Sequence, residues 1–267
     1  MNLLNLLLSV IKKIGILIYL LRPIPFGLGY NQYKIYLIKK KIRKKPINIK
    51  KYIDERIIEI PWIIKNLGKY KSKNILDAGC TLNFDYLINR ILKNNNNILF
   101  TNIFQEKYKF YSKSVKYITG DVSNLPLKNN HFDAVTCLSV LEHVGFNNNM
   151  YDYKKKNKSS INFRTNKNLF KKAIKEFNRV LKPNKWLYLS FPFGKKMIFD
   201  NFQQFDMYDL KKMIKVFSPK KFILNFYMFE DMKWKKVFYE NCRNCEPIYK
   251  DNTGISSKSI VLLKMKK

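Results

Sequence analysis

The sequence has few of the residues that build disulfide frameworks and zinc sites. Its 267 residues include 4 cysteines and 2 histidines. Two of the thiols, Cys80 and Cys137, fall in positions expected for the core or a turn of a sheet, which argues against a disulfide framework and for a reducing, cytoplasmic compartment. Cys242 and Cys245 form a lone CxxC pair without the second ligand pair of a structural zinc site. We therefore expect four ordinary thiols.

Acidic residues and arginine are also scarce. The chain has 52 basic and 19 acidic residues, a formal charge of +33, but only 7 of the basic residues are arginine. Arginine supplies the planar fork that phosphate and base recognition favours. The 45 lysines are therefore interpreted as solvated surface, and nucleic acid is the less favoured partner. The charge still favours anionic surroundings such as phospholipid headgroups.

An uninterrupted apolar run long enough to span a bilayer is missing from the start of the chain. Residues 1–21 are almost wholly apolar, but Lys12 and Lys13 interrupt them, whereas a spanning helix needs about 20 apolar residues. The polar positions gather on one narrow stripe. This pattern predicts an amphipathic helix over residues 1–29 that lies on a membrane surface, followed by a basic linker over 30–52. The alternative is a helix that packs on the protein body or on a second copy; the oligomeric state stays open.

Short apolar runs alternate with helical stretches over the rest of the chain, which indicates a mostly parallel sheet. We expect an α/β domain over residues 53–267, with a seven-stranded doubly wound sheet. A leading helix over 53–67 carries Trp62, a candidate lid or a core residue. Residues 146–166 show little periodicity and are interpreted as an insertion. The expected strands cover 74–77, 98–103, 115–119, 132–138, 185–191, 222–229 and 260–264.

The first of these strands ends in a glycine turn that leads into a helix over 84–93. Asp77 stands at the carboxyl end of the strand, and Gly79 allows the backbone to approach a ligand closely. The N-terminus of the following helix offers unpaired N–H groups. A dinucleotide fingerprint would need three glycines here, and only Gly79 is present. Alone, the pattern fits a nucleotide pocket about as well as a tight turn within a core.

Further motifs follow in a characteristic order. They are Gly120-Asp121, Leu125-Pro126, Phe132-Asp133, Leu141-Glu142-His143-Val144 and Arg179-Val180-Leu181-Lys182-Pro183. In this order and spacing, residues 57–195 resemble the class I S-adenosylmethionine (SAM)-dependent methyltransferases, most closely the type 11 branch. The remainder more loosely resembles the enzymes found in bacterial surface-glycan gene clusters.

The resemblance implies which residues bind the cofactor SAM. Asp77, Gly79 and Cys80 would line its methionine and ribose side, and Leu138 would pass below the methionine end. Asn102 stands where the family places a carboxylate for the ribose hydroxyls. Asp121 would accept the adenine amino group, and the Val122 N–H would meet a ring nitrogen. Thr81 and Asn83 stand where the family has glycines.

The Glu142-His143 pair marks the candidate catalytic position. His143 is the best general base, because the unperturbed histidine pKa lies near neutrality, although a structural role fits equally well. Some quinone O-methyltransferases bind a metal ion through Glu-x-x-Glu-His at this place. Here Ser139 replaces the first glutamate, so we expect no metal ion.

These features predict a methyltransferase that acts on an oxygen of a small molecule, a glycan or a lipid-linked intermediate, in the cytoplasm or peripherally at a membrane surface. Two alternatives stay open. One is an RNA methyltransferase, which would gather basic residues around the pocket mouth. The other is a catalytically inactive SAM-fold scaffold, suggested by Thr81, Asn83 and Asn102.

Overall fold

The computed structural model describes residues 10, 14, 28–47, 53–94, 96–149, 152, 165–249 and 255–267. Most of the predicted membrane-surface helix over 1–29 and most of the insertion over 146–166 lie outside these residues, so both stay predictions. Within the described ranges, none of the helices has the length and apolar character needed to cross a bilayer.

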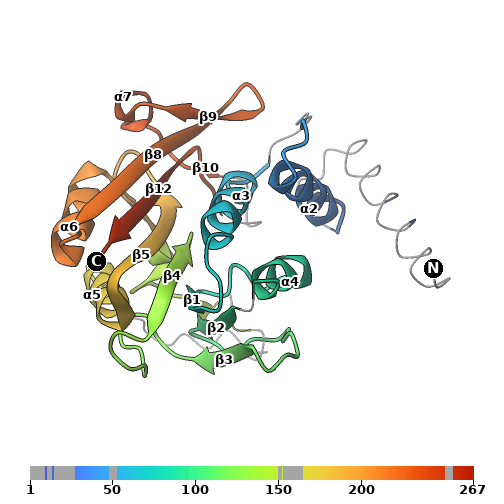
Figure 1. The fold of residues 1–267 in the computed structure, drawn as a ribbon. Coiled ribbons are helices and arrows are strands. Elements are labelled where there is room, and N and C mark those ends of the chain that lie inside the picture. The colour runs from blue at the N-terminus through green and yellow to red at the C-terminus, as the bar shows by residue number, and fades with distance from the viewer. Residues whose placement is uncertain are drawn as a thin grey trace.

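Eight strands form one twisted central sheet (Figure 1). The first five in the sheet order β3-β2-β1-β4-β5 are parallel, and β12, β8 and β9 continue it antiparallel. The strands are β1 (Asn74–Ala78), β2 (Asn97–Asn102), β3 (Val115–Thr119), β4 (Phe132–Leu138), β5 (Leu181–Pro192), β8 (Lys221–Glu230), β9 (Lys233–Val237) and β12 (Ser259–Lys266). Two small ribbons accompany the sheet, β6 (Met197–Ile198) with β7 (Gln203–Gln204) and β10 (Ile248–Tyr249) with β11 (Ile255–Ser256).

The predicted α/β class and mostly parallel sheet are confirmed, but the predicted number of seven strands is wrong. The strand that sequence reasoning missed is β9, which pairs with β8 at the sheet edge. Three of its five residues are lysines, so its sequence resembled the lysine-rich stretches that were interpreted as solvated surface. Trp234 anchors it: this side chain is buried, and its Nε1–H donates to the Ile53 carbonyl at 2.8 Å.

Helices cover both faces of the sheet (Figure 1). Helices α5 (Phe170–Val180) and α6 (Met207–Phe217) lie on one face, and α3 (Arg56–Leu67) and α4 (Asp85–Leu92) on the other. Helix α2 (Leu28–Ile42) packs on α3 through buried Tyr33, Leu37 and Ile38. The prediction of a basic linker is therefore wrong over 30–42. The apolar residues pack this segment on α3 as a helix, and its lysines are exposed or half-buried.

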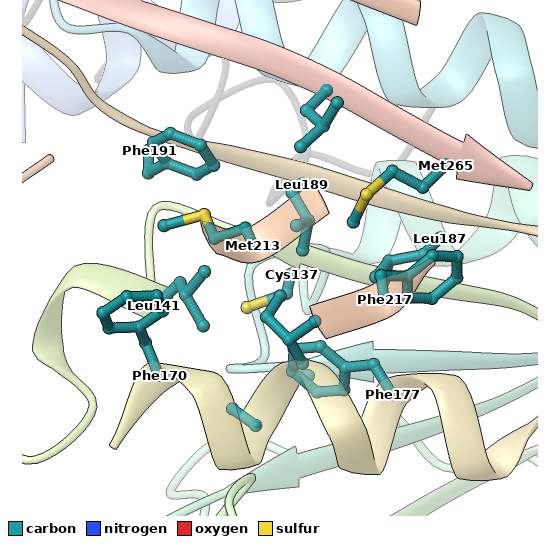
Figure 2. Packing of buried hydrophobic residues seen from close by; sticks show 14 of the residues in the cluster. Cys137, Leu141, Phe170, Phe177, Leu187, Leu189, Phe191, Met213, Phe217 and Met265 are labelled. Carbon is teal, nitrogen blue, oxygen red and sulfur yellow. The ribbon is translucent and has the colours of Figure 1, made fainter. Parts of the chain in front are cut away.

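The core on the α5 side explains why the sequences of the central strands are continuous apolar runs. Strand β4 is buried along its whole length. Figure 2 shows Cys137 from this strand and Leu189 from β5 packed among Phe177 of α5 and Met213 of α6. Cys242 of the short helix α7 (Tyr239–Cys242) and Cys245 are buried in the same cluster. These thiols thus serve packing in the described structure.

The connectivity reverses beside β1. The chain continues from β1 to β2 and β3 on one side, and then returns to place β4 and β5 on the other. In open α/β sheets, ligands bind at the carboxyl ends of the strands where the order reverses. The fold therefore puts a crevice after Ala78 and Leu138.

Candidate functional site

A cavity of about 660 Å³ lies at this crevice. Its walls come from the segments that follow β1, β2, β3 and β4, from the residues at the start of α3, and from residues flanking the insertion. Among the predicted cofactor residues, Gly79, Cys80, Asn102, Asp121 and Val122 line it, as does the predicted base His143. The reversal of strand order beside β1 thus brings together residues from four separate segments of the sequence.

The turn after β1 has its left-handed backbone at Gly79 and Cys80, with φ of 108° and 57°. The Gly79 N–H donates to the Thr101 carbonyl at 2.8 Å, which fastens the turn to the end of β2. Thr81 and Asn83, the positions where the family has glycines, are not among the described residues with positive φ. Their departure from the family pattern therefore does not strain this turn.

Both side chains hold the turn in place. Thr81 Oγ1 donates to the Leu138 carbonyl at 2.9 Å and so joins the turn to β4. Asn83 Nδ2 donates to the Tyr108 carbonyl at 2.7 Å, and its Oδ1 accepts from the Tyr117 hydroxyl at 2.7 Å. Side-chain hydrogen bonds from Thr81 and Asn83 thus fix the conformation of a turn that has no further glycines.

Asp77 and Leu138 lie behind the cavity wall and are not among its lining residues. The Asp77 side chain is fully buried, and its carboxylate accepts from the Leu82 N–H at 2.8 Å and from Thr136 Oγ1 at 2.6 Å. Burial raises the Asp77 pKa to about 6, and these hydrogen bonds oppose the rise. Asp77 therefore shapes the turn from inside, and its predicted contact with a cofactor stays a prediction.

The opposite end of the cavity, after β2 and β3, carries the polar groups expected for a nucleoside. Asn102 ends β2, and its carbonyl accepts from the Gly120 N–H at 2.9 Å. Asp121 is exposed, and its Oδ1 accepts from the Ser123 N–H at 2.8 Å, which orients the carboxylate. Thr101 is among the lining residues, and its buried Oγ1 has no hydrogen-bond partner among the described residues. Such a hydroxyl keeps unused hydrogen-bonding capacity next to the cavity.

Glu142 and His143 lie in a short 3₁₀-helix, η1 (Leu141–His143), after β4. His143 Nδ1 lies 2.8 Å from the Asn201 carbonyl. Because a carbonyl only accepts, Nδ1 carries the proton, and Nε2 is the basic nitrogen of the neutral ring. Burial lowers the His143 pKa. A histidine kept neutral in this way is suited to take up a proton.

Arg56 fixes the start of α3 to the end of β4. Its Nη1 donates to Glu59 Oε2 at 2.7 Å and to the Leu138 carbonyl at 2.9 Å. Glu59 is fully buried and also accepts from Ser139 Oγ at 2.5 Å. Ser139, which replaces the first glutamate of the metal-binding pattern, thus contacts a glutamate supplied by another element.

Trp62 is not a lid over the cavity. Its ring packs edge-on against Tyr188 of β5 with centroids 5.7 Å apart, and it is not among the lining residues. Trp62 is partly buried and packs against the core on the α3 side of the sheet. The segment before and at the start of α3 lines the cavity instead, through Asp54, Glu55 and Arg56. Sequence reasoning missed these three, although charged residues within an otherwise isoleucine-rich stretch were a usable signal.

Glu55→Gln is expected to raise stability increasingly as the pH rises. Burial, with the nearby Asp54 and Glu59 carboxylates, raises the Glu55 pKa from 4.5 to about 8. Between these values the folded state holds a proton that the unfolded state has lost, so the free energy of unfolding falls as pH increases. Glutamine does not titrate. Urea unfolding at pH 5 and pH 8 should show an advantage for the variant that grows to at least about 1 kcal/mol. An advantage independent of pH would contradict this assignment.

Comparison with known proteins places this geometry among relatives. A family model described as a methyltransferase domain matches residues 76–189. An uncharacterized protein of Methanocaldococcus jannaschii is 30% identical over 96 residues, which are 36% of this chain and 41% of that protein. The chain thus matches about two fifths of that relative's length.

Solved structures with a similar fold include two methyltransferases. A SAM-dependent methyltransferase of Methanosarcina mazei is 14% identical, with a TM-score of 0.46 over 76% of this chain and 96% of that one. The 1,6-didemethyltoxoflavin N1-methyltransferase of Burkholderia thailandensis, solved with its substrate and S-adenosylhomocysteine, is 11% identical, with a TM-score of 0.46 over 76% of this chain and 73% of that one.

Proposed function

We propose that residues 76–189, which match a family model described as a methyltransferase domain, belong to the type 11 branch of the class I SAM-dependent methyltransferases, and that the protein uses this domain to methylate an acceptor held in the cavity beside His143. The observation that carries the proposal is the convergence of the turn after β1, the ends of β2 and β3, and the Glu142-His143 pair on one cavity.

The residues present fit SAM. The cavity is of the size that small-molecule and cofactor sites have, about 300–1,000 Å³. Asn102 and the unpartnered Thr101 hydroxyl offer hydrogen-bonding groups for a ribose, and Asp121 offers an acceptor for an exocyclic amine. The positive φ of Gly79 and Cys80 exposes backbone on the same wall. When bound, SAM would supply an electrophilic methyl group on a sulfonium sulfur.

The chain's own contribution is to position the acceptor, exclude water and remove a proton. His143 Nε2 takes up the proton from the acceptor as the acceptor atom bonds to the methyl carbon. The Asn201 carbonyl holds the ring in the required tautomer and orientation. Buried Phe146 and Phe202 line the same part of the cavity and restrict access of water.

The resemblance to surface-glycan methyltransferases favours as acceptor an oxygen of a small molecule, a glycan or a lipid-linked intermediate. We also propose that residues 1–29 contact an anionic membrane surface. The high lysine content and the predicted amphipathic segment support it. Partition of the full chain and of a variant lacking residues 1–25 onto anionic vesicles would test this part.

Asp121→Ala is expected to weaken binding of SAM and of S-adenosylhomocysteine by about tenfold or more, because a hydrogen bond to a charged group contributes roughly 1.5–3 kcal/mol. Isothermal titration of the purified protein with both ligands measures this. Asp231→Asn, which changes an exposed carboxylate on the β8–β9 hairpin, is the matched control and should bind normally.

The outcomes test the cofactor pocket against the alternative of an inactive scaffold. Wild-type binding that Asp121→Ala weakens supports the cofactor pocket and justifies a screen of acceptors. Failure of the wild type to bind either ligand would overturn the proposed function and favour an inactive scaffold.

A further inference from the structure

The ionisable side chains that line the cavity are mostly acidic, although the protein is strongly basic. The chain carries a formal charge of +33 and 45 lysines, yet no lysine is among the described residues that line the cavity. The lining acids are Asp54, which is paired with Lys34, and Glu55, Asp121 and Glu142. Among the lining residues described, the one permanent cation is Arg56, which is paired with Glu59. A ligand that enters this cavity therefore meets mainly carboxyl groups.

Glu142 is the most unusual of these acids. Only 2% of the residue is exposed, and its Oε2 has no hydrogen-bond partner among the described residues. A carboxylate oxygen left in this state is costly unless a ligand supplies a donor or a cation. Burial raises the Glu142 pKa well above its usual range, and the nearby Glu59 carboxylate adds to the rise. The Arg56 guanidinium opposes this rise, but it donates to Glu59 and the Leu138 carbonyl, so Glu142 Oε2 keeps the capacity to accept a hydrogen bond from a ligand.

Aromatic rings line the same end of the cavity. Phe146 and Phe202 are each 1% exposed, and Phe202 stacks on Phe199 with ring centroids 4.4 Å apart. Aromatic faces attract cations, and a carboxylate beside them strengthens that preference. This combination suits an ammonium group on a small organic molecule.

This end of the cavity is also separate from the nucleoside end. Asn102 and Asp121 follow β2 and β3, on one side of β1. Glu142, Phe146 and Pro192 follow β4 and β5, on the other side. The cavity therefore has room for an acceptor beside Glu142 when a cofactor occupies the opposite end.

On the premise of the proposed methyltransferase function, we infer that the acceptor carries an amino group, which Glu142 binds as an ammonium ion in the part of the cavity that Phe146 and Phe202 line. The inference concerns the charge near the methylated atom and is compatible with transfer to oxygen. It disfavours phosphorylated acceptors, including RNA, because a phosphate would face carboxylates with no lysine on the described wall.

The test compares three probes of similar shape and different charge. These are 2-phenylethylamine, 2-phenylethanol and phenylacetate, titrated into the full-length protein saturated with S-adenosylhomocysteine. We expect the amine to bind at least tenfold more tightly than the alcohol, and the carboxylate most weakly. In Glu142→Gln the preference for the amine should disappear while S-adenosylhomocysteine binds as in the wild type. Glutamine is isosteric with the protonated carboxyl group that burial favours, so the variant is expected to fold.

Each outcome decides a different point. Loss of S-adenosylhomocysteine affinity in Glu142→Gln would assign this carboxylate to the cofactor and overturn the inference alone. Equal or absent binding of the three probes to the wild type would also overturn it. Failure of S-adenosylhomocysteine to bind the wild type would instead refute the proposed function on which the inference rests. Glu246→Gln, which alters an exposed carboxylate paired with Lys195, is the control and should keep the wild-type preference.

Discussion

Arg56→Met is expected to lower the free energy of unfolding by about 3–5 kcal/mol, the usual effect of removing one partner of a buried ion pair. The Glu59 side chain is fully buried and that of Arg56 is 25% exposed. The variant leaves the Glu59 carboxylate in the interior with Ser139 as its remaining donor among the described residues. It also removes the bond from Arg56 to the Leu138 carbonyl, which joins α3 to the end of β4. Urea unfolding followed by circular dichroism measures the change.

Two further variants identify the cause of this loss. Arg56→Met combined with Glu59→Gln should recover a large part of the stability, because the neutral amide oxygen still accepts from Ser139 and no charge is left buried. Lys195→Met removes a pair whose side chains are 62% and 56% exposed, so its effect should be much smaller than that of Arg56→Met. Equal losses in Arg56→Met and Lys195→Met would show that burial does not decide the strength of this pair.

The sequence predicted those parts of the fold that depend on local pattern. Strand β4 is apolar throughout because both faces are covered, and such a run is visible without a structure. Strand β9 was missed because it lies at an edge, where three lysines face solvent on the outside of a hairpin. Helix α2 was missed because its lysines suggested a linker, whereas its apolar side packs on α3.

The sequence predicted those cavity residues that belong to a local motif. Gly79, Asp121 and His143 line the cavity as their motifs indicated. Asp77 does not line the cavity, since its carboxylate points to the backbone of its own turn. Side-chain direction decides this, and motif spacing does not predict it. Arg56 and Glu59 were missed because their partners, Leu138 and Ser139, are about 80 residues away in the chain. Such pairings are set by tertiary packing.

Gly79→Ala is the second change with a large expected effect. The Gly79 φ is 108°, and an added Cβ would lie 2.2 Å from Val140 Cγ2. The left-handed region costs a residue with a Cβ about 1–2 kcal/mol, and overpacking costs about 1–3 kcal/mol. We expect a loss of about 2–5 kcal/mol in the free energy of unfolding from these two terms. Binding of S-adenosylhomocysteine should also weaken, because the distorted turn forms the cavity wall.

Two comparisons separate backbone strain from crowding. Val140→Ala removes the two methyl groups that the new Cβ would meet, so the double variant should recover the crowding part and keep the cost of positive φ. Gly120→Ala is the matched control at another glycine that lines the cavity, since its Cβ would lie 3.5 Å from Pro126 and its φ is outside the positive range. It should cost less than about 1 kcal/mol, because ordinary contacts leave no clash to relieve. Full recovery in the double variant would mean that the turn tolerates a side chain, and Gly79 would then be required only for the space beside Val140.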